Sequence, residues 1–154
     1  MADPSLEDIQ ALLELTHRYA FALDGRRWDQ LRDLFTDDVE LDYGLGPEFI
    51  IRGVDTFIEA SRAAVEAMDA TQHMFTNHLF DVDGNSAKGR YYMQAQHMKL
   101  DAAGGVLHTL GGIYEDEFVR TGQGWKVRRR SFRAIWGRGN NSFNPGFRSD
   151  EPSA

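Results

Sequence analysis

Five histidines, together with carboxylates, tyrosines and arginines, are the side chains of this sequence that could carry out chemistry. The chain has no cysteine, which excludes disulfides, thiol catalysis and zinc–thiolate sites. Spacings typical of a metal site, such as H-x-H or H-E-x-x-H, are absent, and we expect no bound metal. The chemistry that remains is acid–base catalysis by imidazole, carboxylate and phenol groups. The five histidines are His17, His73, His78, His97 and His108.

The histidines fall in segments with two kinds of periodicity. His17 lies on the polar side of a predicted helix and is expected at the surface. The other four lie in β-rich segments, in which alternate residues share a face. In the first of these segments His73, Phe75 and Asn77 share one face. His78 lies on the opposite face, so His73 and His78 can enter one cavity only if a bulge intervenes.

Tyr19 and Asp24 lie near the end of the first predicted helix. They are five residues apart, about 140° around an ideal helix, so they would flank one cavity rather than stack. Each also has a simpler interpretation, because Tyr19 could be a core aromatic and Asp24 a solvated carboxylate beside Gly25. The residues alone therefore support a pocket with a few polar groups among apolar ones.

The elements that must position these residues can be read from periodicity and turn residues. Ser5 and Asp8 form a weak version of a capping box, the apolar stripe after them predicts a helix, and Gly25 ends it. The later predicted elements are, in chain order, a helix over 28–35, a strand over 39–43, a helix over 54–68, and strands over 71–82, 87–100, 106–120 and 125–136.

Helices followed by an antiparallel meander indicate an α+β domain. We expect a cone-shaped barrel, in which a strongly curved antiparallel sheet is covered by the N-terminal helices and encloses one pocket. The domain is predicted over residues 1–138. Residues 139–154 lack periodicity and are rich in Asn, Ser, Gly and Pro, which predicts a flexible or pocket-draping tail.

Length and composition bound the class of protein. At 154 residues, with 42% hydrophobic residues, the chain is long enough for one domain with a continuous core. Its 17 Lys and Arg against 24 Asp and Glu give a net charge of −7, which argues against nucleic acid or an anionic membrane as partner. No apolar run approaches the ~20 residues of a transmembrane helix, and the acidic N-terminus does not resemble a signal peptide. We therefore expect a soluble, cytoplasmic protein that acts on a small molecule.

Three stretches together resemble the SnoaL-like family of the nuclear-transport-factor-2-like superfamily, on the branch that contains scytalone dehydratase and bile acid dehydratase. They are RYAFALDGRRWDQL at 18–31, TQHM with the following NH at 71–78, and GGIYEDEF with WKV at 111–127. The resemblance covers about residues 5–138. It implies the α+β cone described above, cofactor-independent elimination by an Asp–His pair, and a homodimer or homotrimer.

The resemblance also implies roles for individual residues. The catalytic candidates are Asp24, His73, Tyr19 and His108, and the substrate-binding candidates are Tyr43, Arg133, Asn77, Phe21 and Phe75. Asp24 and His73 are expected within hydrogen-bond reach, although His108 could replace His73 as the base. The pocket is predicted to be lined by Phe21, Phe35, Phe57, Phe75 and Leu110. Leu23 stands where scytalone dehydratase has a tyrosine, so scytalone is not the expected substrate.

The chemistry of such a pair favours an elimination. A neutral imidazole, with a pKa near ~6.5, removes a carbon-bound proton only if a neighbouring carbonyl or phenol acidifies it. The leading hypothesis is a cofactor-independent lyase of the dehydratase type, acting on a hydroxylated aromatic, steroid-like or polyketide molecule. An isomerase, an aldol cyclase or a retro-aldol carbon–carbon lyase on the same scaffold remains open. So does a non-catalytic ligand-binding or dimerisation module.

Overall fold

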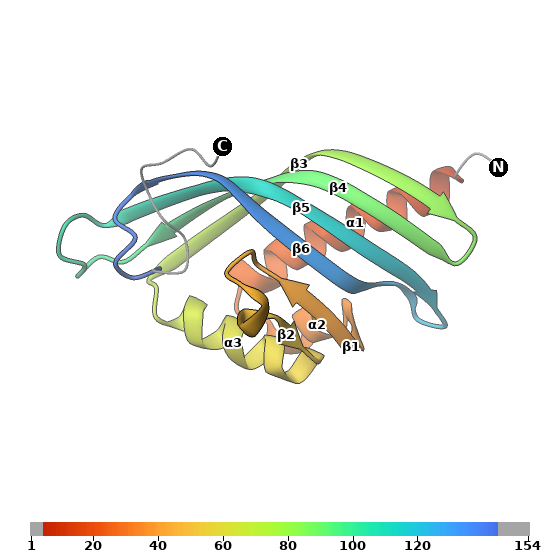
Figure 1. The fold of residues 1–154 in the computed structure, drawn as a ribbon, viewed down its shortest axis with the longest axis horizontal. Coiled ribbons are helices and arrows are strands. Elements are labelled where there is room, and N and C mark those ends of the chain that lie inside the picture. Colours follow the sequence, from red (N-terminus) through yellow and green to blue (C-terminus); the bar gives the residue numbers. More distant parts are fainter. Residues whose placement is uncertain (1–4, 145–154) are drawn as a thin grey trace.

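The computed structural model describes residues 5–144 and confirms the predicted α+β fold (Figure 1). Its sheet has the strand order β2-β1-β6-β5-β4-β3. The helices are α1 (Leu6–Asp24), α2 (Trp28–Arg32) and α3 (Val54–Glu66), with a 3₁₀ turn η1 (Pro47–Phe49). The strands are β1 (Phe35–Asp42), β2 (Ile51–Arg52), β3 (Ala70–Asp83), β4 (Ser86–Met98), β5 (Leu107–Thr121) and β6 (Gly124–Gly139). Of the predicted tail, residues 145–154 lie outside the described part.

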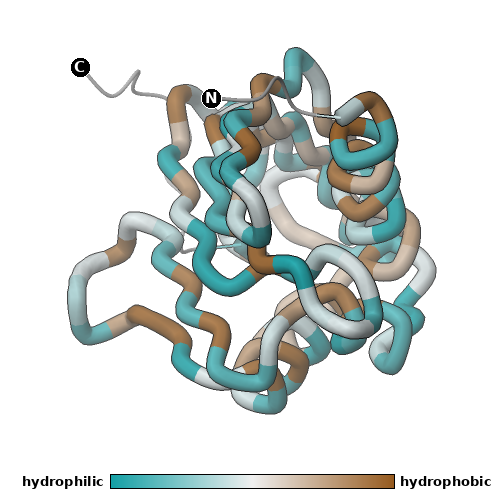
Figure 2. Tube along the Cα trace, turned by 90° about the vertical axis from the view of Figure 1, so that its right-hand side faces the viewer, coloured by the Kyte–Doolittle hydropathy of each residue, from teal (hydrophilic) through white to brown (hydrophobic). Residues whose placement is uncertain are grey.

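The helices pack against one face of the long, curved strands (Figures 1 and 2). The start of α1 confirms the predicted cap, since the hydroxyl of Ser5 accepts a hydrogen bond of 3.1 Å from the backbone N–H of Asp8. The carboxylate of Asp8 in turn accepts hydrogen bonds from Arg120 and from the indole of Trp125. These contacts fix the beginning of α1 to the turn between β5 and β6.

The end of α1 confirms the predicted boundary but not its expected cause. Gly25 has a negative φ of −82°, so it is not the left-handed residue that commonly follows a helix. A Cβ on Gly25 would lie 2.8 Å from the carbonyl oxygen of Phe21, and this close approach is what requires glycine. The left-handed residue is Arg26, with φ 53°. Its guanidinium donates to the carbonyl of Met68 at 2.8 Å and so anchors the end of α1 beside the segment that follows α3.

The sheet departs from the prediction in one pairing. The meander β3–β4–β5–β6 is antiparallel, as predicted, but β1 pairs with β6 in parallel. Part of the predicted second helix also belongs to β1, because α2 ends at Arg32 and Phe35 already begins the strand. The inner face of the sheet and the helices share one apolar core, in which Leu12 and Val127 are fully buried.

A β-bulge changes which residues of β3 face the interior. Thr76 pairs with Tyr92 but Leu79 pairs with Arg90, so β3 holds one residue more than β4 at this point. Asn77 takes up the bend with a φ of 58°, a conformation that asparagine tolerates better than most residues. The bulge turns His78 inward and leaves Asn77 exposed on the outer side. From strand alternation alone, His73 and His78 could face the same side only if such a bulge intervened.

The outer face of the sheet carries exposed apolar side chains, which include Met74, Leu79 and Tyr92. The homodimer or homotrimer that the resemblance implies stays a prediction. Within residues 5–144, no helix combines the length and the apolar character needed to cross a membrane.

Candidate active site

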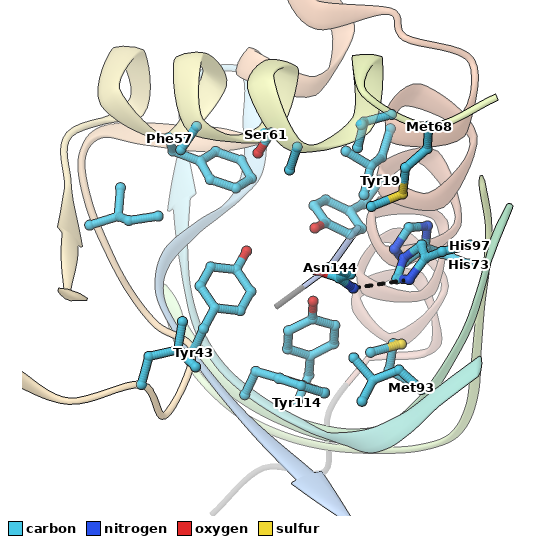
Figure 3. Close-up of a pocket in the computed structure, with 18 of the residues that line it drawn as sticks. Tyr19, Tyr43, Phe57, Ser61, Met68, His73, Met93, His97, Tyr114 and Asn144 are labelled. Atoms are coloured by element: carbon cyan, nitrogen blue, oxygen red, sulfur yellow. Dashed lines mark hydrogen bonds between the residues drawn. The ribbon is translucent and has the colours of Figure 1, made fainter. Parts of the chain in front are cut away.

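A cavity of about 420 Å³ lies between the helices and the concave face of the sheet (Figure 3). Most of its wall is apolar and comes from α1, the segment 43–51, α3 and the strands β4 and β5. The polar side chains that line it are Tyr19, Tyr43, Ser61, His73, His97, Tyr114 and Asn144. This composition, a mostly apolar wall with a few convergent polar groups, is typical of a small-molecule site.

Asp24 and His73 form the hydrogen-bonded pair that the sequence predicted. His73 Nδ1 lies 2.7 Å from Asp24 Oδ1, and both side chains are mostly buried, with exposed fractions of 9% and 21%. The carboxylate is held from two further directions, because it accepts from the hydroxyl of Thr71 and from the backbone N–H of His73, each at 2.8 Å. A carboxylate on Nδ1 places the imidazole hydrogen there, which leaves Nε2 with a free electron pair. His73 can therefore act as a base toward a molecule in the cavity.

Three phenol hydroxyls point into the same cavity, those of Tyr19, Tyr43 and Tyr114 (Figure 3). Burial raises the pKa of Tyr43 and of Tyr114 well above the ordinary value. Both phenols therefore keep their hydrogens at neutral pH and remain hydrogen-bond donors. Donors that converge on one point of an apolar cavity are suited to stabilise an oxyanion.

Behind two of these tyrosines lies a fully buried ion pair. The guanidinium of Arg130 donates to both carboxylate oxygens of Asp116, at 2.8 and 2.7 Å, and to the hydroxyl of Tyr91. The same guanidinium lies over the rings of Tyr19 and Tyr114, 4.3 and 4.4 Å from their centroids. The guanidinium faces the π-electrons of both rings, and this cation–π contact packs the two tyrosines against the buried ion pair.

His97 is the second imidazole in the cavity wall. Its ring centroid lies 5.5 Å from that of His73, and His108 stacks on its other side at 6.0 Å. Burial, with smaller contributions from His73 and His108, lowers the pKa of His97 to about 3. His97 is therefore neutral throughout the physiological range. Its Nδ1 lies 3.1 Å from the side-chain amide nitrogen of Asn144.

The structure brings some of the predicted residues together and separates others. Tyr19, Tyr43 and His73 line the cavity, as do Phe57 and Leu110. Asp24 contacts His73 from behind, and the contact predicted between the two is confirmed. His108 is fully buried behind His97 and is not part of the cavity wall. The geometry therefore favours His73, not His108, as the imidazole that meets a substrate.

Four predicted substrate-binding positions, and one predicted lining residue, are corrected by the structure. Phe21 is 76% exposed on the outer side of α1, and Asn77 is exposed at the bulge. Arg133 lies on the outer face of β6 and is exposed. Phe75 and Phe35 are buried, but both pack behind Tyr19 in the aromatic core rather than in the cavity wall.

Several residues of the site were missed from the sequence. His97 shares a strand face with Met93, which the alternation in β4 indicates, but nothing in the sequence shows that this face meets His73. The inward position of Arg130 could not be predicted from alternation, because β6 shifts register next to Val127. There Phe118 pairs with Val127 and Glu117 pairs with Arg129. Asn144 comes from the segment after the last strand, where no periodicity places it.

Among the described residues, no group of three or more His, Asp or Glu side chains is arranged to hold a metal ion. The rings of His73 and His97 meet edge to face and those of His97 and His108 stack, but the three histidines do not form a group that could hold a metal ion.

Comparisons with known proteins find relatives of this chain in sequence and in structure. A family model described as a SnoaL-like domain matches residues 4–131. The uncharacterized protein Rv2910c of Mycobacterium tuberculosis H37Rv is 30% identical over 130 residues, which cover 81% of this chain and 84% of that protein. The crystal structure of a candidate aromatic ring hydroxylase from Novosphingobium aromaticivorans has a TM-score of 0.82 at 26% identity and covers 92% of this chain and 99% of that one.

Two further solved structures share the fold at lower identity. A candidate scytalone dehydratase from Novosphingobium aromaticivorans has a TM-score of 0.83 at 24% identity and covers 99% of this chain and 97% of that one. A type 2 hexachlorocyclohexane dehydrochlorinase, LinA, has a TM-score of 0.76 at 17% identity and covers 89% and 91%. Proteins that are named as lyases therefore have this architecture.

Proposed function

We propose that this chain, which belongs to the SnoaL-like domain family, is a cofactor-independent lyase of the dehydratase type. The observation that carries the proposal is the pair Asp24–His73 at the wall of a cavity into which three phenol hydroxyls point. A module that only binds a ligand has no need of a carboxylate fixed on the far nitrogen of a cavity imidazole. Two fold neighbours whose names describe eliminations, a dehydratase and a dehydrochlorinase, support the same class.

The elimination begins with proton removal. Nε2 of His73 takes the hydrogen from a carbon next to the substrate's carbonyl group, and the electron pair of that C–H bond passes to the carbonyl oxygen as an enolate. Asp24 stabilises the imidazolium that forms and keeps its ring in place. The hydroxyls of Tyr19, Tyr43 and Tyr114 donate to the enolate oxygen, where the negative charge develops.

The second half of the reaction expels the leaving group. As the enolate collapses, a double bond forms between the α and β carbons and the C–O bond at the β carbon breaks. The imidazolium of His73 returns its proton to the departing hydroxide, which leaves as water. Both members of the pair end in the state in which they began, so the chain needs no other reactant for the cycle.

The cavity favours an uncharged, ring-sized substrate. Its described lining contains no lysine or arginine, since Arg133 is outside and the charge of Arg130 is neutralised by Asp116. An anionic substrate would lose its hydration there without gaining a countercharge. A hydroxylated aromatic, steroid-like or polyketide molecule with one carbonyl or phenol oxygen fits both the apolar wall and the cluster of donors.

The test is turnover of a panel of neutral β-hydroxy ketones and para-hydroxyaryl carbinols by the wild type and His73→Ala, followed by mass spectrometry. We expect loss of one water by the wild type and at least a ~10³-fold lower kcat in His73→Ala. His17→Ala, which removes an exposed histidine, is the matched control and should keep full activity.

The products separate the proposal from its alternatives. Unchanged mass with a displaced double bond would indicate an isomerase, and release of an aldehyde would indicate retro-aldol cleavage. Binding of the panel without turnover, with His73→Ala binding equally well, would contradict the lyase and leave a ligand-binding module.

A further inference from the structure

The segment after β6 is fixed against the sheet by a set of hydrogen bonds. Gly139, the last residue of β6, has a φ of 96°, and a Cβ there would lie 2.3 Å from the backbone oxygen of Leu107, so only glycine allows the turn. The amide of Asn140 then donates to the carbonyls of Ala103 and Gly105, both at 2.8 Å. These contacts tie the segment to the loop between β4 and β5.

The anchored turn carries Asn144 into the cavity. The backbone N–H of Ser142 donates to the side chain of Asn140, and that of Asn144 donates to the carbonyl of Asn141. The side chain of Asn144 then lies in the cavity wall with its amide nitrogen 3.1 Å from His97 Nδ1 (Figure 3).

We propose that Asn144 is a positioning residue that holds His97 as the tautomer with its hydrogen on Nε2, so that His97 serves the cavity as a neutral hydrogen-bond donor. An amide N–H can only donate, so the ring nitrogen that it meets must accept and carry no hydrogen. The single hydrogen of a neutral imidazole then resides on the other nitrogen.

The surroundings of His97 keep it in the neutral state that this role requires. The titratable groups that face it are His73 from β3, His108 from β5 and, with the opposite effect, Asp24 from α1. Because burial disfavours the charged form, the pKa of His97 stays near 3 despite Asp24. A neutral imidazole is too weak an acid to give up its N–H, so His97 donates a hydrogen bond to a substrate oxygen and transfers no proton.

The role of His97 in catalysis rests on the proposed lyase function, but the tautomer does not. Nitrogen NMR of the full chain with ¹⁵N-labelled histidine reports which ring nitrogen carries the hydrogen, without any substrate. His97→Gln assigns the signals by removing one imidazole from the spectrum. In the wild type we expect His97 to be protonated at Nε2 and neutral from about pH 5 to pH 8.

Two substitutions test whether Asn144 causes this state. In Asn144→Asp a carboxylate replaces the amide and can only accept, so the hydrogen should move to Nδ1. In Asn144→Ala the constraint is gone, and both tautomers should be present. Ser142→Ala, an exposed position in the same turn, is the matched control and should leave the spectrum unchanged. A wild-type hydrogen on Nδ1, or an unchanged tautomer in Asn144→Asp, would overturn the proposal.

Kinetics on a substrate found by the panel above provide the second readout. Asn144→Ala should lower kcat by about 10–100-fold with little change in KM, because loss of an outer hydrogen bond disorients a donor that acts in the transition state. An unchanged kcat together with the expected tautomer shift would overturn the catalytic part alone. If no substrate is turned over, the proposed lyase function is contradicted, while the NMR result still decides which tautomer of His97 is present.

Discussion

Asp24→Asn should remove the base function of His73 while the protein stays folded. The carboxylate accepts from His73 Nδ1 and Thr71 on one oxygen and from the backbone N–H of His73 on the other. An asparagine amide can face these groups in two ways. With its oxygen toward Nδ1, its NH₂ group meets the backbone N–H of His73, and two donors oppose each other. With its oxygen toward the backbone N–H, its NH₂ group donates to Nδ1 and to the hydroxyl of Thr71, which turns from donor to acceptor, and every contact is satisfied.

The second arrangement is therefore the one that we expect, and it removes the base. When Nδ1 accepts, the imidazole hydrogen moves to Nε2, the atom that must take the substrate's proton. Loss of the correct tautomer in an acid–base pair lowers kcat on the order of 10⁴-fold, about 5.5 kcal/mol at the transition state. Stability should fall by only about 1–3 kcal/mol, because hydrogen bonds that involve a charged carboxylate are replaced by hydrogen bonds between neutral groups.

The assay compares kcat, urea unfolding and the histidine tautomer for the wild type, Asp24→Asn and Asp29→Asn. Asp29 is an exposed carboxylate of α2 whose side chain is not part of the site, which makes it the matched control. Wild-type kcat in a folded Asp24→Asn would refute the assignment of His73 as the base. A hydrogen that stays on Nδ1 of His73 would refute the argument from amide geometry.

Two further predictions follow from the buried groups. Arg130→Met leaves the carboxylate of Asp116 buried without its partner and should lower the free energy of unfolding, measured by urea titration, by about 3–5 kcal/mol. The double variant Arg130→Met with Asp116→Leu should recover much of this loss. Equal losses in both variants would contradict the prediction. For pH, the folded-state pKa of His97 is about 3 against an ordinary 6.5, so between these values only the unfolded chain binds the proton. The free energy of unfolding should therefore fall by up to about 1.4 kcal/mol per unit as pH drops through this window, a slope that His97→Gln should remove. Parallel curves for wild type and His97→Gln between about pH 7 and pH 4 would contradict the shift.

The fold follows from signals that are local in the sequence. The cap at Ser5, the apolar stripe of α1 and the turn residues between the long strands each depend on a few neighbouring residues. The third helix was predicted over 54–68 and ends at Glu66, a difference within the usual fraying of helix ends. The parallel pairing of β1 with β6 joins segments about ninety residues apart, and no local signal announces it.

The site was predicted less completely because strand alternation fails at a bulge. One extra residue reverses the face of every later residue in the strand. Strict alternation, which ignores this bulge, therefore placed Asn77 inside and His78 outside. A similar shift in β6 turns Arg130 inward three residues after Val127, where strict alternation would have chosen Arg129. The pair of Asp24 and His73 was predicted correctly because it lies before the bulge and because the family resemblance fixed both positions.

The two cavity imidazoles differ in the group that meets Nδ1. His73 meets a carboxylate, which holds the hydrogen on Nδ1 and leaves Nε2 free to accept a proton. His97 meets an amide, which occupies Nδ1 and leaves the hydrogen on Nε2, where it can be donated. Elimination next to a carbonyl needs one acceptor for the carbon-bound proton and donors for the oxygen that becomes negative. The double variant Asp24→Asn with Asn144→Asp exchanges the two partners and should reverse both tautomers. Nitrogen NMR that finds the hydrogen on Nε2 of His73 and on Nδ1 of His97, in a folded but inactive protein, would show that Asp24 and Asn144 assign these roles.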